Sequence, residues 1–571
     1  MRRFSNIVFG TLFLSTSLVS CSFLDVEPQG VFTEETVSSV KNLDNLCIAA
    51  YAALANDHYT APLSLWPYGS VRADDAYKGG RDESDIQEFH FYEIASNIRT
   101  DFGNPDELWY LCYVGVGRAN TAIKALRKTD IKDFPKRDER IAEMRFIRGH
   151  FHFLLKELYK NIPYVTDSVS ADTISNVAYS NDSLWALIAE DFRYGYEHLP
   201  LEQEDKGRPT RYAAAAYLAK TYLFKAYRQD EMHNVTGIDK EDLNKVLEYT
   251  NFVMSGPYRL ETDYAYNFLP EHENGPESVF AIQFSTGDGT KYGRVNTSDV
   301  LNFPLGINKD ADCIGGCDFH KPSQNLVNAF KTAGGLPLFD TYNDENYGYN
   351  GSAPMSNYHN AIGEVDNRLY HTVALPGYPF KYNYSTYDQS WNRNIPVYGI
   401  YATMKECVSP LSFAFVQMPP FLATSMNRII IRYADVLLWR AEALIELNTS
   451  LGEALDLINQ VRLRAQNNAS ILYATNCNTQ PYPGGFASQD QLRTALRWER
   501  RLEFAMEGSR FFDLTRWGIA AEVMNDYYMK EQTLRTYMQG AHFDKNKEEY
   551  LPIPLQQISF SKRLYQQNYG Y

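Results

Sequence analysis

The chain has 571 residues, with 55 Lys and Arg against 70 Asp and Glu, and a formal net charge of −15 at pH 7. This acidic balance argues against nucleic acid as a partner, because nucleic-acid binding depends on Lys and Arg side chains that neutralise phosphates. It is compatible with a neutral ligand. Tyrosine is unusually abundant, with 42 residues, and its flat apolar ring with a terminal hydroxyl suits sugars and peptides alike.

An export and lipidation signal occupies the N-terminus. Arg2 and Arg3 precede a mostly apolar stretch over residues 7–19, which is about as long as the core of a signal peptide and too short for a resident membrane helix. Leu18-Val19-Ser20-Cys21 then has the pattern of a lipobox, in which the thiol of Cys21 receives a diacylglycerol. We therefore expect a signal peptide at 1–20 and a lipidated tether at 21–42. An ordinary secretory signal with a chance cysteine is the alternative.

Hydrophobic residues at helical spacing predict a mostly helical region over 43–258. The pattern is clear in five segments: 104–126, 140–159, 182–199, 211–227 and 243–254. Gly115-Val116-Gly117 looks like part of a dinucleotide-binding loop, but it lacks the third glycine and lies inside a helical pattern, so we interpret it as packing. Cys47 and Cys112 lie in helical patterns too, and we expect them in the core.

The sequence changes character between about residues 261 and 426, where Gly, Pro, Asn and Tyr crowd together. A short strand is expected over 279–284. A loop-rich region of this length inside a helical protein is unusual and tends to carry function. Cys313-Ile-Gly-Gly-Cys317 leaves three alternatives open: two free thiols, a local disulfide, or half of a metal site, for which no second pair at zinc spacing is present. We predict no bound metal and no cofactor.

Helical patterns return after this region. Segments 429–447 and 454–465 form a second helix pair, and small residues at the expected helix crossings are similar to tetratricopeptide units; an irregular helical bundle is the alternative. Apolar residues over 492–506 then share one helical face, and Gly508 stands where a helix needs a left-handed C-terminal cap. Phe511, Leu514 and Trp517 follow at three-residue steps. This segment reads as two helices that meet at a glycine corner.

Several motifs, taken in chain order, resemble the SusD/RagB family of bacterial surface nutrient-binding lipoproteins. They follow the lipobox and cover most of the mature chain in pieces. The motifs lie at 24–28, 143–151, 161–165, 208–210, 431–443, 458–462, 501–518 and 550–554. Their order along the chain, behind a lipobox, makes the match specific.

The resemblance implies a mostly α fold, in which tetratricopeptide-like helix pairs form a right-handed helical scaffold with a loop-rich irregular lobe inserted. On this basis residues 43–571 form a single SusD-like domain. Its parts are a helical scaffold at 43–260 and 427–530, a ligand lobe at about 261–426 and a C-terminal segment at 531–571.

The resemblance also implies a location and a partner. The protein is expected at the outer membrane, held by its lipid anchor, and the acidic Asp25 and Glu27 close behind Cys21 resemble a signal for export to the cell surface. The expected partner is a SusC-like TonB-dependent transporter, over which the protein sits as a lid.

Aromatic side chains in loops are the candidates for ligand contact. Sugar rings stack on Trp and Tyr, while sugar hydroxyls need amide, carboxylate or guanidinium partners. The family builds its site from an early loop and a mid-chain excursion, which directs attention to two regions of this chain. The candidates are Trp66, Tyr68, Asp74, Asp75, Tyr77 and Arg81 in the early region, and Tyr342, Tyr347, Tyr349 and Trp391 in the late region. For each aromatic taken singly, burial in the core is the alternative.

Catalytic motifs are missing from the sequence. It contains no G-x-S-x-G, H-E-x-x-H or Walker sequence. Glu499 and Glu503 could serve as a pair of glycosidase carboxylates, but the adjacent Arg500 and Arg501 favour ionised, ion-paired carboxylates over a proton donor. We therefore expect a protein that is not an enzyme.

The expected function is capture of an oligosaccharide at the cell surface and its delivery to the transporter without bond cleavage. Peptide binding within the same family is the nearest alternative. A surface glycoside hydrolase and a scaffold that binds only proteins are further alternatives.

Overall fold

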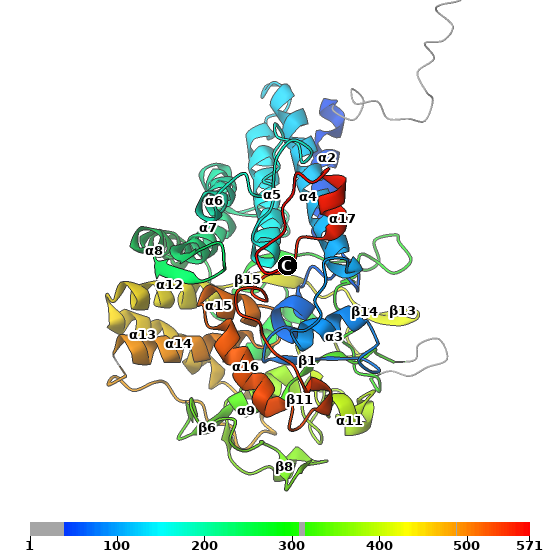
Figure 1. The fold of residues 1–571 in the computed structure, drawn as a ribbon, viewed down its shortest axis with the longest axis vertical. Helices are drawn as coiled ribbons and strands as arrows, with labels where there is room; N and C mark the ends of the chain where they lie inside the picture. Colours follow the sequence, from blue (N-terminus) through cyan, green and yellow to red (C-terminus); the bar gives the residue numbers. More distant parts are fainter. Residues whose placement is uncertain (1–38, 308–314, 487) are drawn as a thin grey trace, which may run out of the picture.

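The computed structural model describes residues 39–307, 315–486 and 488–571 (Figure 1). The predicted signal peptide, the lipobox cysteine Cys21, most of the tether at 21–42 and Cys313 lie outside these residues. Among the described helices, none combines the length and the apolar character that a membrane crossing requires.

The helices of the scaffold pack each on the next along the chain. From α4 to α8 every helix contacts its successor; α8 then contacts α12, which packs on α13 and α14. These helices are α2 (Leu43–Ala53), α4 (Gly103–Lys128), α5 (Arg137–Tyr159), α6 (Asn181–His198), α7 (Arg211–Ala226), α8 (Lys240–Met254), α12 (Tyr433–Leu447), α13 (Leu451–Ala465) and α14 (Gln489–Phe504). The stack therefore continues across the long insertion between α8 and α12. The predicted mostly helical fold with paired helices is confirmed.

Local sequence explains where these helices begin and how closely they pack. Ser180, Thr210 and Asp239 each accept a hydrogen bond from the backbone N–H three residues further on, at 3.2, 3.2 and 2.9 Å, which satisfies a free donor of the first turn. Where α4 meets α5, a Cβ on Gly115 would lie 2.2 Å from the ring of Phe151. Glycine is needed for this close approach, so the interpretation of Gly115 as packing is confirmed.

Residues 261–426 form a lobe of short strands and turns, coloured green to yellow in Figure 1. In two of its sheets, one strand comes from outside residues 261–426. β4 (Ser278–Ile282) pairs with β15 (Arg428–Arg432), which confirms the predicted strand at 279–284, and β5 (Phe319–Pro322) pairs with β1 (Ala76–Gly79). The other strands of the lobe are β6 (Lys331–Ala333), β7 (Leu336–Pro337), β8 (Tyr349–Asn350), β9 (Ala353–Pro354), β10 (Glu364–Val365), β11 (Val373–Ala374), β12 (Ala402–Thr403), β13 (Phe415–Met418) and β14 (Phe421–Thr424).

Short elements complete the fold. The lobe contains α9 (Gln324–Ala329), α10 (Leu369–Thr372) and α11 (Ile395–Tyr398); α3 (Gln87–Glu93) precedes the scaffold helix α4. The hairpin of β2 (Tyr227–Gln229) and β3 (Val235–Ile238) separates α7 from α8. Helices α15 (Arg510–Arg516), α16 (Ala520–Glu531) and α17 (Leu555–Phe560) follow α14.

Buried tyrosines supply part of the interior of the lobe. The hydroxyls of Tyr358 and Tyr401 lie 2.5 Å apart, and the hydroxyl of Tyr401 donates to Oε1 of Gln324 at 2.7 Å. Both tyrosine side chains are 1% exposed. A buried ring with a hydrogen-bonded hydroxyl fills space without leaving a polar group unsatisfied. Much of the tyrosine content of the lobe therefore serves packing.

The predicted corner between two C-terminal helices is present, but it is longer than predicted. Helix α14 ends at Phe504, and Met506 already has a left-handed backbone with φ of 65°. Gly508 has the predicted positive φ, 75°, yet it lies four residues beyond the helix and does not cap it directly. Gly508 also makes a close contact with the early segment, since a Cβ on Gly69 would lie 1.8 Å from the carbonyl oxygen of Gly508. The backbone of the early segment therefore packs directly against the backbone of this corner.

A buried network of ion pairs joins the scaffold to the lobe, and we call it the Glu503 network. At its centre, Glu503 of α14 accepts hydrogen bonds from Arg432 at 2.8 Å, from Arg368 at 3.1 Å and from Arg464. Its members are four arginines, Arg368, Arg432, Arg462 and Arg464, and four carboxylates, Glu277, Asp366, Glu499 and Glu503. Their side chains are 4% exposed or less. Charges therefore balance inside the protein.

The network keeps its carboxylates ionised. Burial alone would raise the pKa of Glu503, but the guanidinium groups of Arg464, Arg432 and Arg368 outweigh that effect and hold the pKa well below its usual range. Because the folded-state pKa is depressed, the stabilisation is present above the unfolded-state pKa of roughly 4.3 and is lost as the pH falls below it.

Replacement of Glu503 by Gln should lower the free energy of unfolding by about 3–5 kcal/mol at pH 7, because it leaves buried guanidinium groups without their counter-charge. Denaturant unfolding measures the change. The matched control is Glu453→Gln on α13, whose ion pair with Arg440 is partly exposed, with Glu453 42% exposed; it should change stability by about 1 kcal/mol or less. The difference between wild type and Glu503→Gln should shrink as the pH is lowered towards 3. Equal effects of the two substitutions would contradict this account.

Candidate ligand-binding site

The early candidates are buried, and this corrects the prediction for Trp66, Tyr68 and Tyr77. All three side chains are 0% exposed, so they offer no ring face to a ligand. The indole of Trp66 donates to the carbonyl of Ser298 at 3.1 Å, and the hydroxyl of Tyr77 accepts from the backbone N–H of Gln324 at 3.0 Å. The local sequence is typical of an exposed loop, but segments distant in the chain cover it.

Asp74 and Asp75 are also buried, each 1% exposed, and they hold the early segment to the C-terminal helices. Arg510 binds Asp74 through two hydrogen bonds of 2.9 and 3.1 Å, and Arg501 reaches both carboxylates, at 3.0 and 3.2 Å. Burial alone would raise the pKa of Asp74, but the guanidinium groups of Arg501 and Arg510 outweigh that effect and lower the pKa to about 2. These carboxylates are structural ion-pair partners, which corrects their assignment to a ligand site.

The late tyrosine candidates have different surroundings. Tyr347 is 4% exposed and its hydroxyl accepts from Asn476 at 2.6 Å, so the structure corrects its assignment as a displayed ring. Tyr342 is half-buried against Trp498, with ring centroids 5.0 Å apart, and Tyr349 is half-buried in β8. Within the described residues, no ring contact or hydrogen bond joins Tyr342 or Tyr349 to Trp391.

Trp391 and Arg81 belong to segments that the fold does bring together. The side-chain amide of Asn394 donates to the backbone carbonyl of Arg81 at 2.6 Å, and Nη1 of Arg393 lies 3.4 Å from Oδ2 of Asp85. Arg81 is exposed. The pairing of β1 with β5 positions this contact, because it fixes the early segment along the edge of the lobe. The family resemblance led us to expect a site where an early loop meets a mid-chain excursion, and two such segments meet here.

Trp391 is held by other aromatic rings and stays partly exposed. Its ring centroid lies 5.7 Å from Phe380, 5.5 Å from Tyr387 and 6.2 Å from the half-buried Tyr384. A Cβ on Gly306 would lie 2.5 Å from the indole, so backbone also packs against the ring. A partly exposed ring that its neighbours hold in place can serve as a preformed stacking platform.

We call this the Trp391 surface, and it combines an aromatic platform with charged and polar side chains. Tyr384 and Arg393 were not among the predicted contacts, although the runs 381–384 and 391–394 combine aromatic and basic residues as the predicted early loop does, with amides in place of its carboxylates. The Trp391 surface consists of Arg81, Asp85, Tyr384, Trp391 and Arg393.

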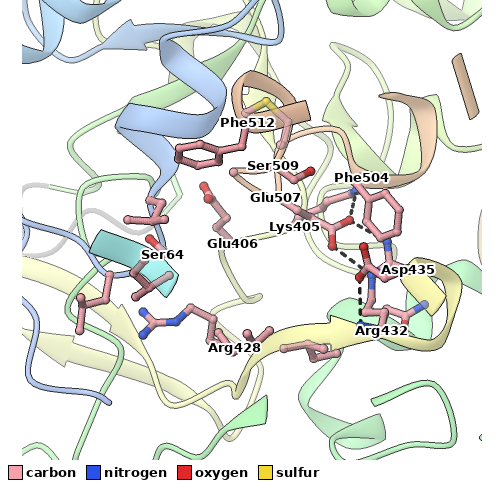
Figure 2. A pocket seen from close by; sticks show the side chains of 18 of the residues that line it. Ser64, Lys405, Glu406, Arg428, Arg432, Asp435, Phe504, Glu507, Ser509 and Phe512 are labelled. Atoms are coloured by element: carbon pink, nitrogen blue, oxygen red, sulfur yellow. Dashed lines mark hydrogen bonds and ion pairs between the residues drawn. The ribbon is translucent and has the colours of Figure 1, made fainter. Parts of the chain in front are cut away.

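A separate cavity of ≈ 190 Å³, with a mixed polar and apolar lining, lies between the scaffold and the lobe (Figure 2). Helices α5, α7, α12, α14 and α15, strand β15 and the segments 63–65 and 405–406 contribute to its lining. Figure 2 shows Glu406 projecting into the open centre, with Phe512 and Ser509 on one side and Arg428 on the other. None of the ten residues predicted to contact ligand lines this cavity. Sequence reasoning missed it because its residues come from many short segments between 63 and 513.

Most charged groups of the cavity are paired within the protein. Lys405 donates to Glu507 at 2.7 Å, and Arg432 binds the same carboxylate at 3.0 Å. Nδ1 of His320 lies 2.5 Å from Glu406. Burial raises the pKa of Glu406 well above its ordinary value and lowers that of His320 to about 3.

The two carboxylates considered for catalysis are ion-paired, and the described residues provide no group for metal binding. Glu499 and Glu503 are both members of the Glu503 network, which confirms their interpretation as ion-paired structural carboxylates. No group of three or more His, Cys, Asp or Glu side chains in the described ranges could hold a metal. Cys47 and Cys112 are 0% exposed, as predicted, and Cys317 is a free thiol.

Comparison with known proteins gives matches over nearly the whole chain. A family model described as "SusD family" matches residues 276–571, and one described as "Starch-binding associating with outer membrane" matches residues 22–223. The chain is 25% identical over 578 residues to SusD-like protein P2 of Formosa agariphila, with 98% of each chain covered.

Solved structures share the fold. A SusD homolog from Bacteroides thetaiotaomicron superposes with a TM-score of 0.70 at 20% identity, covering 94% of this chain and 98% of the other. A laminarin binding SusD-like protein gives a TM-score of 0.66 at 22% identity, covering 93% and 99%. At these identities the likeness establishes the fold alone.

Proposed function

Since the chain belongs to the SusD family, we propose that it is a cell-surface lipoprotein that captures an oligosaccharide and delivers it to a SusC-like TonB-dependent transporter. Family membership agrees with the prediction of a non-catalytic binding protein. The matched family model that describes starch binding in association with the outer membrane, and the structural neighbour that binds laminarin, support a glycan as the ligand. The Trp391 surface is the single observation that carries the proposal.

Capture at this surface rests on stacking and hydrogen bonds. The indole of Trp391 offers its exposed part to the apolar C–H face of a sugar ring, while Arg81, Asp85 and Arg393 supply donors and acceptors for the hydroxyls. Because Phe380, Tyr384 and Tyr387 already fix the indole, little side-chain entropy is lost on binding. Within the described residues the site contains no paired acid and base positioned for cleavage, so the glycan leaves it intact.

The tether would hold this surface near the membrane. From Cys21 to Ser39, the first described residue, 18 steps of extended chain span at most roughly 65 Å. A lipid-modified Cys21 therefore keeps the folded domain within reach of a transporter barrel in the same membrane.

Replacement of Trp391 by Ala should weaken glycan binding by about 2 kcal/mol or more, roughly thirtyfold in Kd, because it removes the stacking platform. A glycan array with protein that begins after Cys21 identifies the ligand, and calorimetry then compares the variants. The matched control is Tyr110→Ala on α4, an exposed aromatic (62%) of the scaffold, which should bind like wild type. Binding of an extended peptide in place of any glycan, or shortening of the oligosaccharide during the assay, would contradict the proposal.

Cys21→Ala should release the protein from the membrane fraction, because it removes the acceptor of the lipid. Cell fractionation with surface proteolysis of intact cells measures both anchoring and exposure. The wild-type protein, solubilised in mild detergent, should co-purify with a TonB-dependent barrel. Recovery of unmodified Cys21 in soluble wild-type protein would show that the anchor is wrong, and repeated purification without a barrel would show that the partner is wrong.

A further inference from the structure

Two charged side chains that line the cavity form no hydrogen bond or ion pair within the described residues. Glu157 of α5 and Lys220 of α7 both line it. Glu157 is 7% exposed, and in the described part of the chain its carboxylate makes no hydrogen bond or ion pair. The ammonium of Lys220 lies over the rings of Phe153 and Phe224, at 4.5 and 5.9 Å, and within the same ranges forms no ion pair with Glu157 or any other carboxylate.

This distinguishes the two side chains from the other charges around them. Of the cavity's arginines, Arg428 is paired with Asp57 at 2.9 Å and Arg500 with Asp513 at 2.7 Å. Asp299 accepts from Ser64 at 2.7 Å. Lys405, Glu406, Arg432 and Glu507 are paired as described above. An unpaired buried carboxyl group is costly, and burial raises the pKa of Glu157 to about 7. The cavity therefore presents one acceptor and one donor that a bound molecule can satisfy.

The size and the walls of the cavity restrict that molecule. The cavity volume of ≈ 190 Å³ lies below the roughly 300–1,000 Å³ of pockets for drug-sized ligands. Apolar rings of Phe224 and Phe512 lie beside the polar groups, together with Ser509. A compact molecule with several hydroxyls and an apolar face matches this lining, and the volume gives room for about one such ring.

We propose that this cavity is a second binding site, which takes one monosaccharide-sized polyol whose hydroxyl groups bridge Glu157 and Lys220. One hydroxyl donates to the carboxylate of Glu157, another accepts from the ammonium of Lys220, and the ring packs against Phe512. The site shares no residue with the Trp391 surface. It goes beyond capture of an oligosaccharide and does not depend on where that oligosaccharide binds.

Crystals of the wild-type protein soaked separately in D-glucose, D-galactose, D-mannose and myo-inositol test the proposal. At least one of these should occupy the cavity as a single ring within hydrogen-bond distance of Glu157 and Lys220. Calorimetry with the sugar that binds should then show that Glu157→Gln and Lys220→Met each weaken its binding about tenfold or more. A trisaccharide of the same sugar should not enter the cavity.

Glu241→Gln and Lys240→Met, on the exposed face of α8, make the same chemical changes outside the cavity and should bind the monosaccharide like wild type. Ordered water alone in the cavity after every soak would overturn the proposal. Unchanged monosaccharide affinity in both cavity variants would overturn it too. The soaks use the wild-type protein, so they decide the question even if a cavity variant fails to fold.

Discussion

The structure depends on the buried ion pairs of the Glu503 network. A lobe built from strands of two to five residues cannot rely on extended sheets for its rigidity. Instead Arg368 and Glu277 of the lobe bind carboxylates and arginines carried by α13, α14 and the end of β15. Four guanidinium groups facing four carboxylates give each buried charge a partner, which is the condition under which such burial is tolerated. The network thereby fixes how the lobe sits on the helical scaffold.

Rigidity of the lobe matters for capture because a preformed surface loses less entropy when it binds. Asp74 and Asp75 also add rigidity, since their ion pairs with Arg501 and Arg510 hold the early segment against the C-terminal corner. β1 then continues from these residues into its pairing with β5, beside the segment that carries Trp391. The stacking platform is thus connected to the scaffold through charged side chains that the sequence analysis had assigned to the ligand.

Helical periodicity predicted the scaffold well, because helices such as α6, α8 and α13 bury one face against a neighbour and so must repeat apolar residues at helical spacing. The motifs of the SusD family located several helices of the same scaffold. The candidate site was harder to predict. Trp66 and Tyr77 stand in a sequence typical of a loop, yet residues about 230 to 450 positions further along the chain cover them. Contacts between residues so far apart in the chain leave no recognisable pattern in the local sequence. Trp391 was predicted, but Tyr384 and Arg393 become candidates only once the position of Trp391 in the structure is known.

The central claim is that this protein holds an intact glycan on a ring fixed at the edge of a rigid lobe. A crystal structure of the protein with an oligosaccharide from the glycan array tests it most directly. The account predicts a sugar ring stacked on Trp391, an uncleaved ligand and a Glu503 network unchanged from the free protein. An oligosaccharide bound away from the Trp391 surface, or a lobe that rearranges its ion pairs to enclose it, would contradict the account.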